Sequence, residues 1–393
     1  MHTSARKKVA KLQAQMTAKD LDVVVCRLPE NIVVLTGFHN VMGWAAVFVP
    51  REGDPILITP THEIGYARND GYEGDIRKVY VFDVDNPEPP PVQVNMRIAE
   101  IAAGLNYKVR RVGYEGSFEV VSPSQLAAWS IVPANPSLDG LRIAFPDAEM
   151  VDATQQILAV RVHKDDHDIA RFKVVGEIAA FGYERLREIC LEHPTEAEAT
   201  GAMQEVVTAK GIGYKGARFA MIWPQVATGT KSAIWFYYHP SAQRRIKEGD
   251  VVLSESACCV DGYYLDLTRT FVVGKPTERQ REIWGLTKTA LDAAIAKVRP
   301  GVLAIEVDEA ARDVLRDYKA QFPHHTGHGL GWKYHEPTPL VAPGSPHVLE
   351  KGMMIALEPA VYIPDYAGFR NEHNVIVTDD GCIVLDDASP VRI

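Results

Sequence analysis

The sequence VVLSESACCVDGYYLDLTRTFVVG, at residues 251–274, constrains the fold more than any other part of the chain. Asp261-Gly262 lies between two runs of strand-forming residues, and this arrangement predicts a β-hairpin with a two-residue turn. In that register Asp266 faces Ala257, and Glu255 lies two residues along on the same face. The two carboxylates are then diagonal neighbours, about 7–8 Å apart between Cα atoms. A slip of one residue would move one of them to the other face of the sheet.

A second pair of strand-like segments lies near the end of the sequence, at 352–362 and 369–378, with the turn-rich IPDYAG between them. A turn centred on Asp365 would place Glu358 opposite Glu372. Each hairpin then supplies two carboxylates to one face of a sheet. Carboxylates brought so close raise one another's pKa unless a cation neutralises them. The sequence therefore predicts a site for one divalent metal ion or a pair of them.

Histidines cluster between the two hairpins, in HHTGHGLG (324–331) and in the HEP that follows at 335–337. Glycines on both sides of His328 allow the backbone to approach a crowded centre closely. A lone histidine is usually structural, but this cluster, in a chain with four spaced carboxylates, favours metal binding. Carboxylate and imidazole ligands suit Mn, Zn, Co or Fe. Such ions lower the pKa of a bound water and orient the resulting hydroxide against a carbonyl, which predicts a hydrolase.

Residues 20–160 alternate short apolar runs with helical stretches, which predicts an α/β layer domain. The opening segment has Val9, Leu12 and Met16 at helical spacing. The proline-rich NPEPPPVQ at 86–93 is expected to be a surface loop, because proline removes a backbone donor. The other expected elements are strands at 22–26, 45–50 and 56–59 and helices near 95–104 and 123–130.

The periodicity changes near residue 160, so we expect two domains, at 1–160 and 161–393. A long amphipathic helix is expected after HKDDHD, and capping boxes open further helices at Thr195 and Thr277. Helices are expected over roughly 278–298 and 304–321. Each half of the second domain then has two helices followed by a hairpin, which predicts an α+β domain with an internal pseudo-repeat.

The composition excludes several classes of protein. The formal net charge of −9 disfavours nucleic-acid binding, because phosphate contacts need a concentrated basic face. No stretch approaches the ~18 continuous apolar residues of a membrane span. The basic N-terminus lacks the apolar core of a secretory signal, and the five scattered cysteines argue for a reducing compartment. We therefore expect a cytoplasmic protein that binds neither nucleic acid nor membranes.

These motifs resemble those of the creatinase/Xaa-Pro peptidase ("pita-bread") family, which also contains the methionine aminopeptidases. NIVVLTGF resembles the family's N-terminal domain, and the second half carries GDVVLSES…DGYYLDLTRTF, HHTGHGLGWKYHEP, EKGMMIALEPAVY and GFRNEHNVIVT in the family order. The resemblance covers the whole chain. It implies a creatinase-like α/β N-terminal domain and a pita-bread catalytic domain. It also implies metal-dependent, Xaa-Pro peptidase-like hydrolysis of peptide or amide bonds by a metal-bound hydroxide.

The resemblance also implies roles for individual residues. His239, in FYYHPSAQ, and His335 would contact the scissile carbonyl and steady the oxyanion. Arg370 would pair with a ligand carboxylate or with the substrate, and Glu358 would act as a general acid and base while it also binds metal. The metal ligands implied by the family pattern are Asp266, His328, Glu358 and Glu372.

Two features depart from the family pattern. The fifth ligand of the family is an aspartate eleven residues before Asp266, and Glu255 occupies that position here. Glutamate is one methylene longer, so either Glu255 still reaches the metal or the first metal position is weak or empty. Many dipeptidases of the family carry an arginine between the HExP segment and the next glutamate. Between Glu336 and Glu358 this chain has only His347 and Lys351 as basic residues.

Three other functions stay open. One is a metal-poor or metal-free hydrolase of C–N bonds in small molecules, related to creatinase and ectoine-ring hydrolases, that uses Glu255 and the histidines. The others are a dimethylsulfoniopropionate lyase and a non-enzymatic binding module. The substrate is expected to be a small peptide or small molecule. The family also implies a homodimer in which Trp44 and His39 of one subunit help to cover the neighbouring site.

Overall fold

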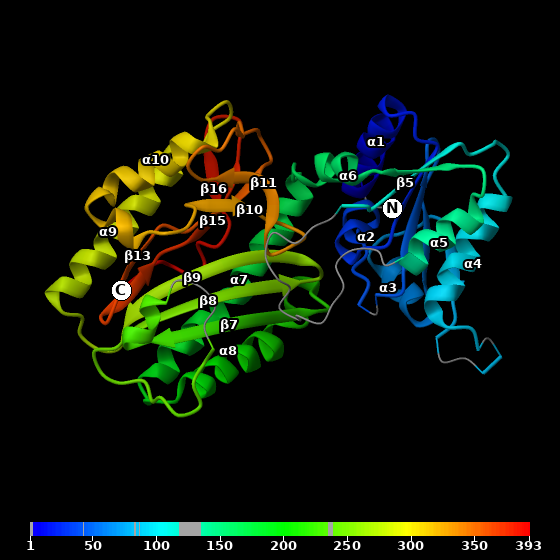
Figure 1. The fold of residues 1–393 in the computed structure, drawn as a ribbon. Helices are drawn as coiled ribbons and strands as arrows, with labels where there is room; N and C mark the ends of the chain where they lie inside the picture. Colours follow the sequence, from blue (N-terminus) through cyan, green and yellow to red (C-terminus); the bar gives the residue numbers. More distant parts are fainter. Residues whose placement is uncertain (1–2, 42, 82–83, 86, 118–134, 235–238) are drawn as a thin grey trace. The chain divides into compact units, whose positions relative to one another are not determined.

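The chain forms two compact units, Met1–Arg161 and Val162–Ile393, in the computed structural model of the protein (Figure 1). The structure describes residues 3–41, 43–81, 84–85, 87–117, 135–234 and 239–393. The helix expected at 123–130 lies outside the described residues. Each unit has its own core of buried apolar side chains.

A mixed sheet with the strand order β4-β3-β2-β1-β5-β6 forms the centre of the first unit. Its strands are β1 (Val23–Cys26), β2 (Ala46–Pro50), β3 (Ile56–Pro60), β4 (Ile76–Val79), β5 (Arg111–Tyr114) and β6 (Glu149–Asp152). The three strands expected from apolar runs are confirmed as β1, β2 and β3. β1 and β2 are buried along their whole length, as strands are when helices cover both faces of a sheet.

The helices of the first unit follow the predicted alternation with strands. The expected opening helix is confirmed as α1, which buries Val9, Leu12 and Met16. The loop expected at 86–93 is wrong in its second half, because α4 begins at Pro90. Proline is tolerated in the first turn of a helix, because the backbone N–H that it lacks would have no acceptor within the helix. The helices are α1 (Thr3–Ala18), α2 (Pro29–Thr36), α3 (Ile64–Asn69) after the 3₁₀ turn η1 (Thr61–Glu63), α4 (Pro90–Ala103), α5 (Asn135–Ala144) and α6 (Thr154–Arg161).

The second unit contains two larger antiparallel sheets and a short two-stranded ribbon. The first sheet has the order β7-β8-β9, the second the order β11-β10-β12-β15-β16, and the ribbon pairs β13 with β14. The strands are β7 (Ala220–Thr228), β8 (Val251–Val260), β9 (Tyr263–Val272), β10 (Gly327–Gly329), β11 (Glu336–Val341), β12 (Met354–Leu357), β13 (Ala360–Ile363), β14 (Ala367–Arg370), β15 (His373–Val377) and β16 (Cys382–Val384).

Two pairs of helices cover these sheets. α7 (Asp166–Cys190) and α8 (Glu196–Gly211) pack on the β7-β8-β9 sheet, and α9 (Glu278–Lys297) and α10 (Ala304–Val314) pack on the other strands (Figure 1). The expected capping boxes at Thr195 and Thr277 are confirmed. α10 is shorter than the expected 304–321, because the backbone leaves helical geometry at Leu315 and continues as the 3₁₀ segment η4 (Arg316–Gln321). The remaining 3₁₀ segments are η2 (Tyr214–Gly216) and η3 (Gly229–Ala233).

The strands expected at 352–362 and 369–378 are each broken in two. The first becomes β12 and β13, since Pro359 has no N–H to continue a ladder. The second becomes β14 and β15. Leu357 pairs with His373 in one ladder and Ala360 with Arg370 in the other. Both ladders share the predicted register centred on Asp365, which has a φ of 58°.

Candidate metal centre

The β8–β9 hairpin brings two acidic side chains to one face of its sheet. Asp261 and Gly262 have φ values of 49° and 83°, as the predicted two-residue turn requires. Ala257 pairs with Asp266, and Glu255 pairs with Thr268. The predicted register is therefore confirmed, and Glu255 and Asp266 are diagonal neighbours.

The second pair of acidic residues lies in the interruption between the two later ladders. Glu358 directly follows β12, and Glu372 directly precedes β15. Both side chains are buried. The N–H of Glu358 donates to the carbonyl of Thr326 at 2.8 Å, which ties the end of β12 to the start of β10. Because both ladders share one register, Glu358 and Glu372 are equally far along the chain from Asp365, one before it and one after it.

His328 is held between two glycines at the centre of the second sheet. A Cβ on Gly327 would lie 2.0 Å from the carbonyl oxygen of Ala356, and one on Gly329 would lie 2.2 Å from that of Thr338. The predicted close backbone approach is therefore confirmed, and no larger residue fits at either glycine. Nδ1 of His328 lies 2.9 Å from the carbonyl oxygen of Gly329. A carbonyl only accepts, so Nδ1 carries the proton and Nε2 presents its lone pair to the site.

Acidic and imidazole groups from separate segments of the second unit meet around His328. Nε2 of His328 lies 3.3 Å from Oδ2 of Asp266 and 3.7 Å from Oε1 of Glu358. Nε2 of His335 also lies 3.3 Å from Oδ2 of Asp266, and Nε2 of His325 lies 3.2 Å from Oε1 of Glu358. Two groups have donor atoms within 4.8 Å of one another and can hold a metal ion: Asp266 with His328 and His335, and His325 with His328 and Glu358.

In this cluster the pKa values of the carboxyl groups are raised and those of the histidines are lowered, so both kinds of group favour their neutral forms. Burial raises the pKa of Asp266 well above its usual range. Burial and the neighbouring Glu372 do the same to the pKa of Glu358, and burial followed by Asp266 raises the pKa of Glu372 to about 8. Burial lowers the pKa of His328 to about 4 and that of His335 well below its usual range. The carboxyl groups therefore hold protons that a bound cation would displace.

Several buried polar atoms of the cluster have no hydrogen-bond partner among the described residues. They are Oδ1 of Asp266, Nε2 of His328 and both carboxylate oxygens of Glu372. A buried polar atom without a partner costs about 1–3 kcal/mol, and more when the group is charged. Carboxylate oxygens together with imidazole nitrogens are the donor set that divalent first-row ions accept. The residues present therefore fit a divalent metal ion.

Glu255 and Arg370 form a separate contact at the edge of this cluster. A guanidinium nitrogen of Arg370 contacts Oε2 of Glu255, and the hydroxyl of Tyr334 donates to Oε1. Arg370 also lies 3.7 Å from Oε2 of Glu358. Glu255 belongs to neither group of potential ligands, and neither does Glu372, although both oxygens of Glu372 lack a hydrogen-bond partner among the described residues. The structure thus places Glu255 beside Arg370, while its role as a ligand remains a prediction.

No contact described here tests the roles expected of His239, His39 and Trp44. His239 is exposed and adjoins residues 235–238, which are outside the described ranges. His39 and Trp44 belong to the first unit and are half-buried there. Their expected roles in catalysis and in covering a partner's site remain predictions.

Sequence reasoning included His325 in the histidine cluster without giving it a role of its own, and it did not select Tyr334. His325 faces Glu358, and Tyr334 binds Glu255. Both lie within the motif HHTGHGLGWKYHEP, and for Tyr334 that position is the only signal in the sequence. Proximity along the chain does not say which face of a strand or loop a side chain occupies, so neither residue stands out before folding.

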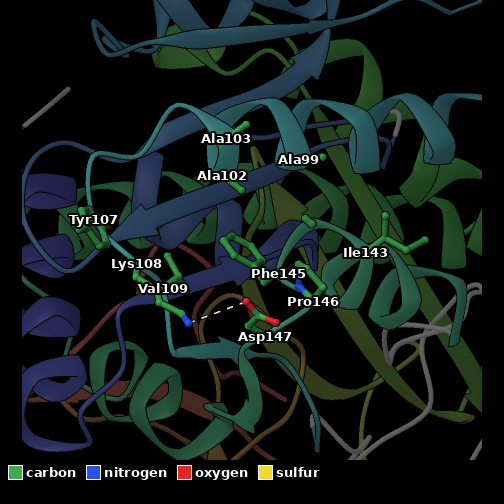
Figure 2. Close-up of a pocket in the computed structure, with 11 residues that line it drawn as sticks. Ala99, Ala102, Ala103, Tyr107, Lys108, Val109, Ile143, Phe145, Pro146 and Asp147 are labelled. Carbon is green, nitrogen blue, oxygen red and sulfur yellow. Dashed lines mark ion pairs between the residues drawn. The ribbon is translucent and has the colours of Figure 1, made fainter.

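A cavity of about 330 Å³ lies in the first unit, between α4 and the segments 107–109 and 143–147 (Figure 2). Its charged lining residues, Lys108 and Asp147, lie 3.8 Å apart and are largely exposed. It gathers no histidine or buried carboxylate, so it is not a candidate catalytic site. Among the helices that the structure describes, none has both the length and the apolar composition needed to cross a bilayer.

Comparisons with known proteins match both units. Residues 170–379 match metallopeptidase family M24, and residues 8–163 match the creatinase/prolidase N-terminal domain. The chain is 29% identical to the putative dipeptidase YkvY of Bacillus subtilis over 91% of each chain. It is 27% identical to an Xaa-Pro dipeptidase of Lactobacillus delbrueckii subsp. lactis over 94% of each chain.

Solved structures agree with the sequence matches. The prolidase of Pyrococcus horikoshii OT3 superposes with a TM-score of 0.76 at 25% identity, over 97% of this chain and 98% of the prolidase. An Xaa-Pro dipeptidase of Bacillus anthracis shares the fold, with a TM-score of 0.78 at 23% identity over 99% of each chain.

These matches confirm the resemblance and the predicted fold class, an α/β creatinase-like domain followed by a pita-bread domain. The family of metallopeptidases implies divalent metal ions, and the buried donor atoms around His328 fit such ions. Since the M24 match covers more than half of the sequence, the chain belongs to metallopeptidase family M24.

Proposed function

We propose that this metallopeptidase hydrolyses the peptide bond of short Xaa-Pro peptides. The observation that carries the proposal is the buried cluster around His328, in which acidic oxygens and an imidazole nitrogen lack hydrogen-bond partners among the described residues. Only a cation makes several ionised carboxylates tolerable at such proximity. The names of the matched relatives, a putative dipeptidase and Xaa-Pro dipeptidases, support the choice of substrate class.

In this proposal Asp266, His328, Glu358 and Glu372 hold the metal, which is Mn, Zn, Co or Fe. When bound, such an ion polarises the scissile carbonyl and activates water for attack. Nε2 of His328 is available as a ligand because its Nδ1 proton is engaged by the carbonyl of Gly329. The contact with this carbonyl thus fixes the imidazole tautomer that metal binding requires.

The remaining groups handle protons and charge. Glu358 receives a proton from the attacking water and passes it to the leaving nitrogen, a task suited to a buried carboxyl group whose pKa is raised. Arg370 lies 3.7 Å from Glu358 and steadies its charge. His335 and His239 are proposed to hydrogen-bond the carbonyl oxygen as it gains negative charge.

Recognition of the substrate's own carboxylate does not use the segment between Glu336 and Glu358. Nδ1 of His347 accepts a hydrogen bond from the N–H of Leu340 at 3.0 Å. Nζ of Lys351 pairs with Asp379 at 2.8 Å. Both basic residues of this segment are thus engaged locally. We propose that groups outside the segment between Glu336 and Glu358 bind the C-terminal carboxylate of the peptide. In this proposal the enzyme also accepts peptides longer than two residues.

We assign the chemistry to residues 161–393 and a covering role to residues 1–160 of a partner subunit in a cytoplasmic homodimer. His39 and Trp44 are the proposed covering residues. Sedimentation at micromolar concentration tests this arrangement. A dimer is expected, and a monomer that retains full activity would rule it out.

The function is tested with protein stripped of metal by a chelator and then reloaded. Release of proline from Xaa-Pro dipeptides and from longer proline peptides is expected to vanish in the stripped protein and to return with Mn, Co or Zn. Asp266→Asn removes a proposed ligand and is expected to abolish activity at any metal concentration. Asp379→Asn is the matched control at an exposed carboxylate and is expected to retain activity.

The second candidate function is a metal-free hydrolase of C–N bonds in small molecules. The pairing of Glu255 with Arg370 and Tyr334, outside the groups of potential ligands, favours it. Full turnover of an amidino or cyclic compound by stripped protein, with no cleavage of Xaa-Pro peptides by the reloaded enzyme, would replace the first proposal with this one.

A further inference from the structure

Glu255 differs from the other acidic residues of the centre in how its charge is balanced. One of its carboxylate oxygens accepts from the hydroxyl of Tyr334, and the other contacts the guanidinium of Arg370. In contrast, both oxygens of Glu372 and one of Asp266 have no hydrogen-bond partner in the described part of the chain. Both oxygens of Glu255 therefore have a charged or polar neighbour, whereas Oδ1 of Asp266 and both oxygens of Glu372 have no hydrogen-bond partner among the described residues.

Arg370 is fixed in place by several independent contacts. Its Nε donates to Oγ1 of Thr268 at 2.8 Å, and Nη1 donates to the hydroxyl of Tyr362 at 3.1 Å. Thr268 is also the residue that pairs with Glu255 across the β8–β9 ladder. The side chain of Arg370 is 4% exposed. Since a guanidinium stays protonated at any pH that a protein survives, a permanent positive charge stands beside Glu255.

The length of Glu255 matters for this pairing. An aspartate here would be one methylene shorter, and its carboxylate would end closer to β8. The extra methylene carries the carboxylate of Glu255 to the guanidinium and to the Tyr334 hydroxyl. The pair is neutral on its own, so Glu255 brings no net negative charge with which to hold a second divalent ion.

We propose that the centre holds a single divalent cation, and that the Glu255–Arg370 ion pair, anchored by Tyr334, replaces the second one. The inference rests on the proposed metal-dependent function and specifies its metal content. Asp266, His328, Glu358 and Glu372 are the ligands of the single cation. Glu255 and Tyr334 are positioning residues that hold Arg370 near Glu358.

Metal content tests the proposal directly. Stripped protein is reloaded with excess Mn²⁺, freed of unbound metal by gel filtration, and measured by elemental analysis and by electron paramagnetic resonance. One ion per chain, with the signal of magnetically isolated Mn²⁺, is expected. Two ions with an exchange-coupled signal would overturn the inference and leave the metal-dependent function intact. No retained ion, with turnover unchanged, would overturn that function as well.

Two near-isosteric variants separate a ligand from a positioning residue. Glu255→Gln is expected to keep one Mn²⁺ per chain, whereas Asp266→Asn is expected to lose it. A loss of metal in Glu255→Gln would show that Glu255 is a ligand and overturn the proposal. In Glu255→Gln, kcat is expected to fall about tenfold or more with little change in KM, as is usual when a supporting contact of a metal site is removed. A kcat equal to that of the unaltered enzyme would also overturn it.

Tyr334→Phe removes only the hydroxyl and provides a second, milder test. It is expected to retain one Mn²⁺ per chain and to lower kcat less than Glu255→Gln does. Tyr318→Phe, at a partly buried tyrosine packed on the apolar core, is the matched control and is expected to change neither quantity. Loss of Mn²⁺ from the Tyr334→Phe variant alone would contradict the assignment of Tyr334 as an anchor of the ion pair.

Discussion

Raising the pH of the metal-free protein from about 6.5 to about 8 is expected to destabilise the second unit. Burial, followed by the neighbouring Asp266, raises the pKa of Glu372 in the folded protein to about 8, from an ordinary value of 4.5. Between these values the folded state holds a proton that the unfolded state has released, so stability falls as pH rises. His328 has the opposite effect, since its pKa is lowered to about 4. Most of that contribution lies below pH 6.5, and only about 0.4 kcal/mol of it is gained between pH 6.5 and 8.

The magnitude follows from the pKa of Glu372. Integrating the linkage for one proton between pH 6.5 and 8 gives a loss of about 1.5 kcal/mol in the free energy of unfolding. For a unit of this size that corresponds to a fall in Tm of roughly 3–6 °C. The pKa values of Asp266 and Glu358 are raised as well, so further protons would steepen the change.

Differential scanning calorimetry of chelator-treated protein measures this loss of stability. The unfolding transition of the second unit is identified as the one that shifts when Mn²⁺ is added. Glu372→Gln removes the ionisable group and is expected to flatten the dependence. Saturation with Mn²⁺ should flatten it too, because metal binding keeps the carboxylate ionised throughout this range. Stability that is constant or that rises from pH 6.5 to 8 in the metal-free protein would refute the reasoning.

Three further substitutions test other parts of the structure. His328→Ala should lower Mn²⁺ affinity, measured by calorimetric titration, by more than about tenfold, and unchanged affinity would exclude His328 as a ligand. Arg269→Ala removes the buried guanidinium that pairs with Asp386, leaving that carboxylate only His373 and the N–H of Asn374, and should reduce stability in urea unfolding by about 3–5 kcal/mol; a loss below about 1 kcal/mol would contradict this. Gly327→Ala should lower Tm sharply because its Cβ would meet backbone 2.0 Å away, whereas Gly285→Ala, in α9 with nothing within 4 Å, should be neutral or slightly stabilising.

The local signals of the sequence predicted much of the second unit. Asp261-Gly262 specifies a turn that needs two positive φ values, so both the β8–β9 hairpin and its register follow from sequence. Thr195 and Thr277 each form a capping box with the residue three positions later, which gives the free backbone N–H groups at the helix start a partner. These helix starts can therefore also be predicted from a few neighbouring residues. Such features depend on few residues and do not require knowledge of the tertiary structure.

The predictions that failed depend on competition between local and tertiary structure. Pro359 interrupts a run of apolar residues that otherwise has the pattern of one continuous strand. Pro90 was expected in a loop, although the first turn of α4 tolerates it. The partner of Glu255 was also beyond local reasoning, because the pairing with Arg370 joins β8 to β14 across more than a hundred positions in the sequence.

Arg269 shows how late in folding the centre must form. Its guanidinium donates to the carbonyl of Glu372 at 2.8 Å and to Oδ2 of Asp386 at 2.6 Å, partners that are 103 and 117 positions away. Contacts between such distant segments form only after long loops have closed. A nascent or partly folded chain therefore has no preformed pocket that could capture a stray ion. In the proposed function, the metal ion would therefore bind at a centre that only the folded second unit assembles.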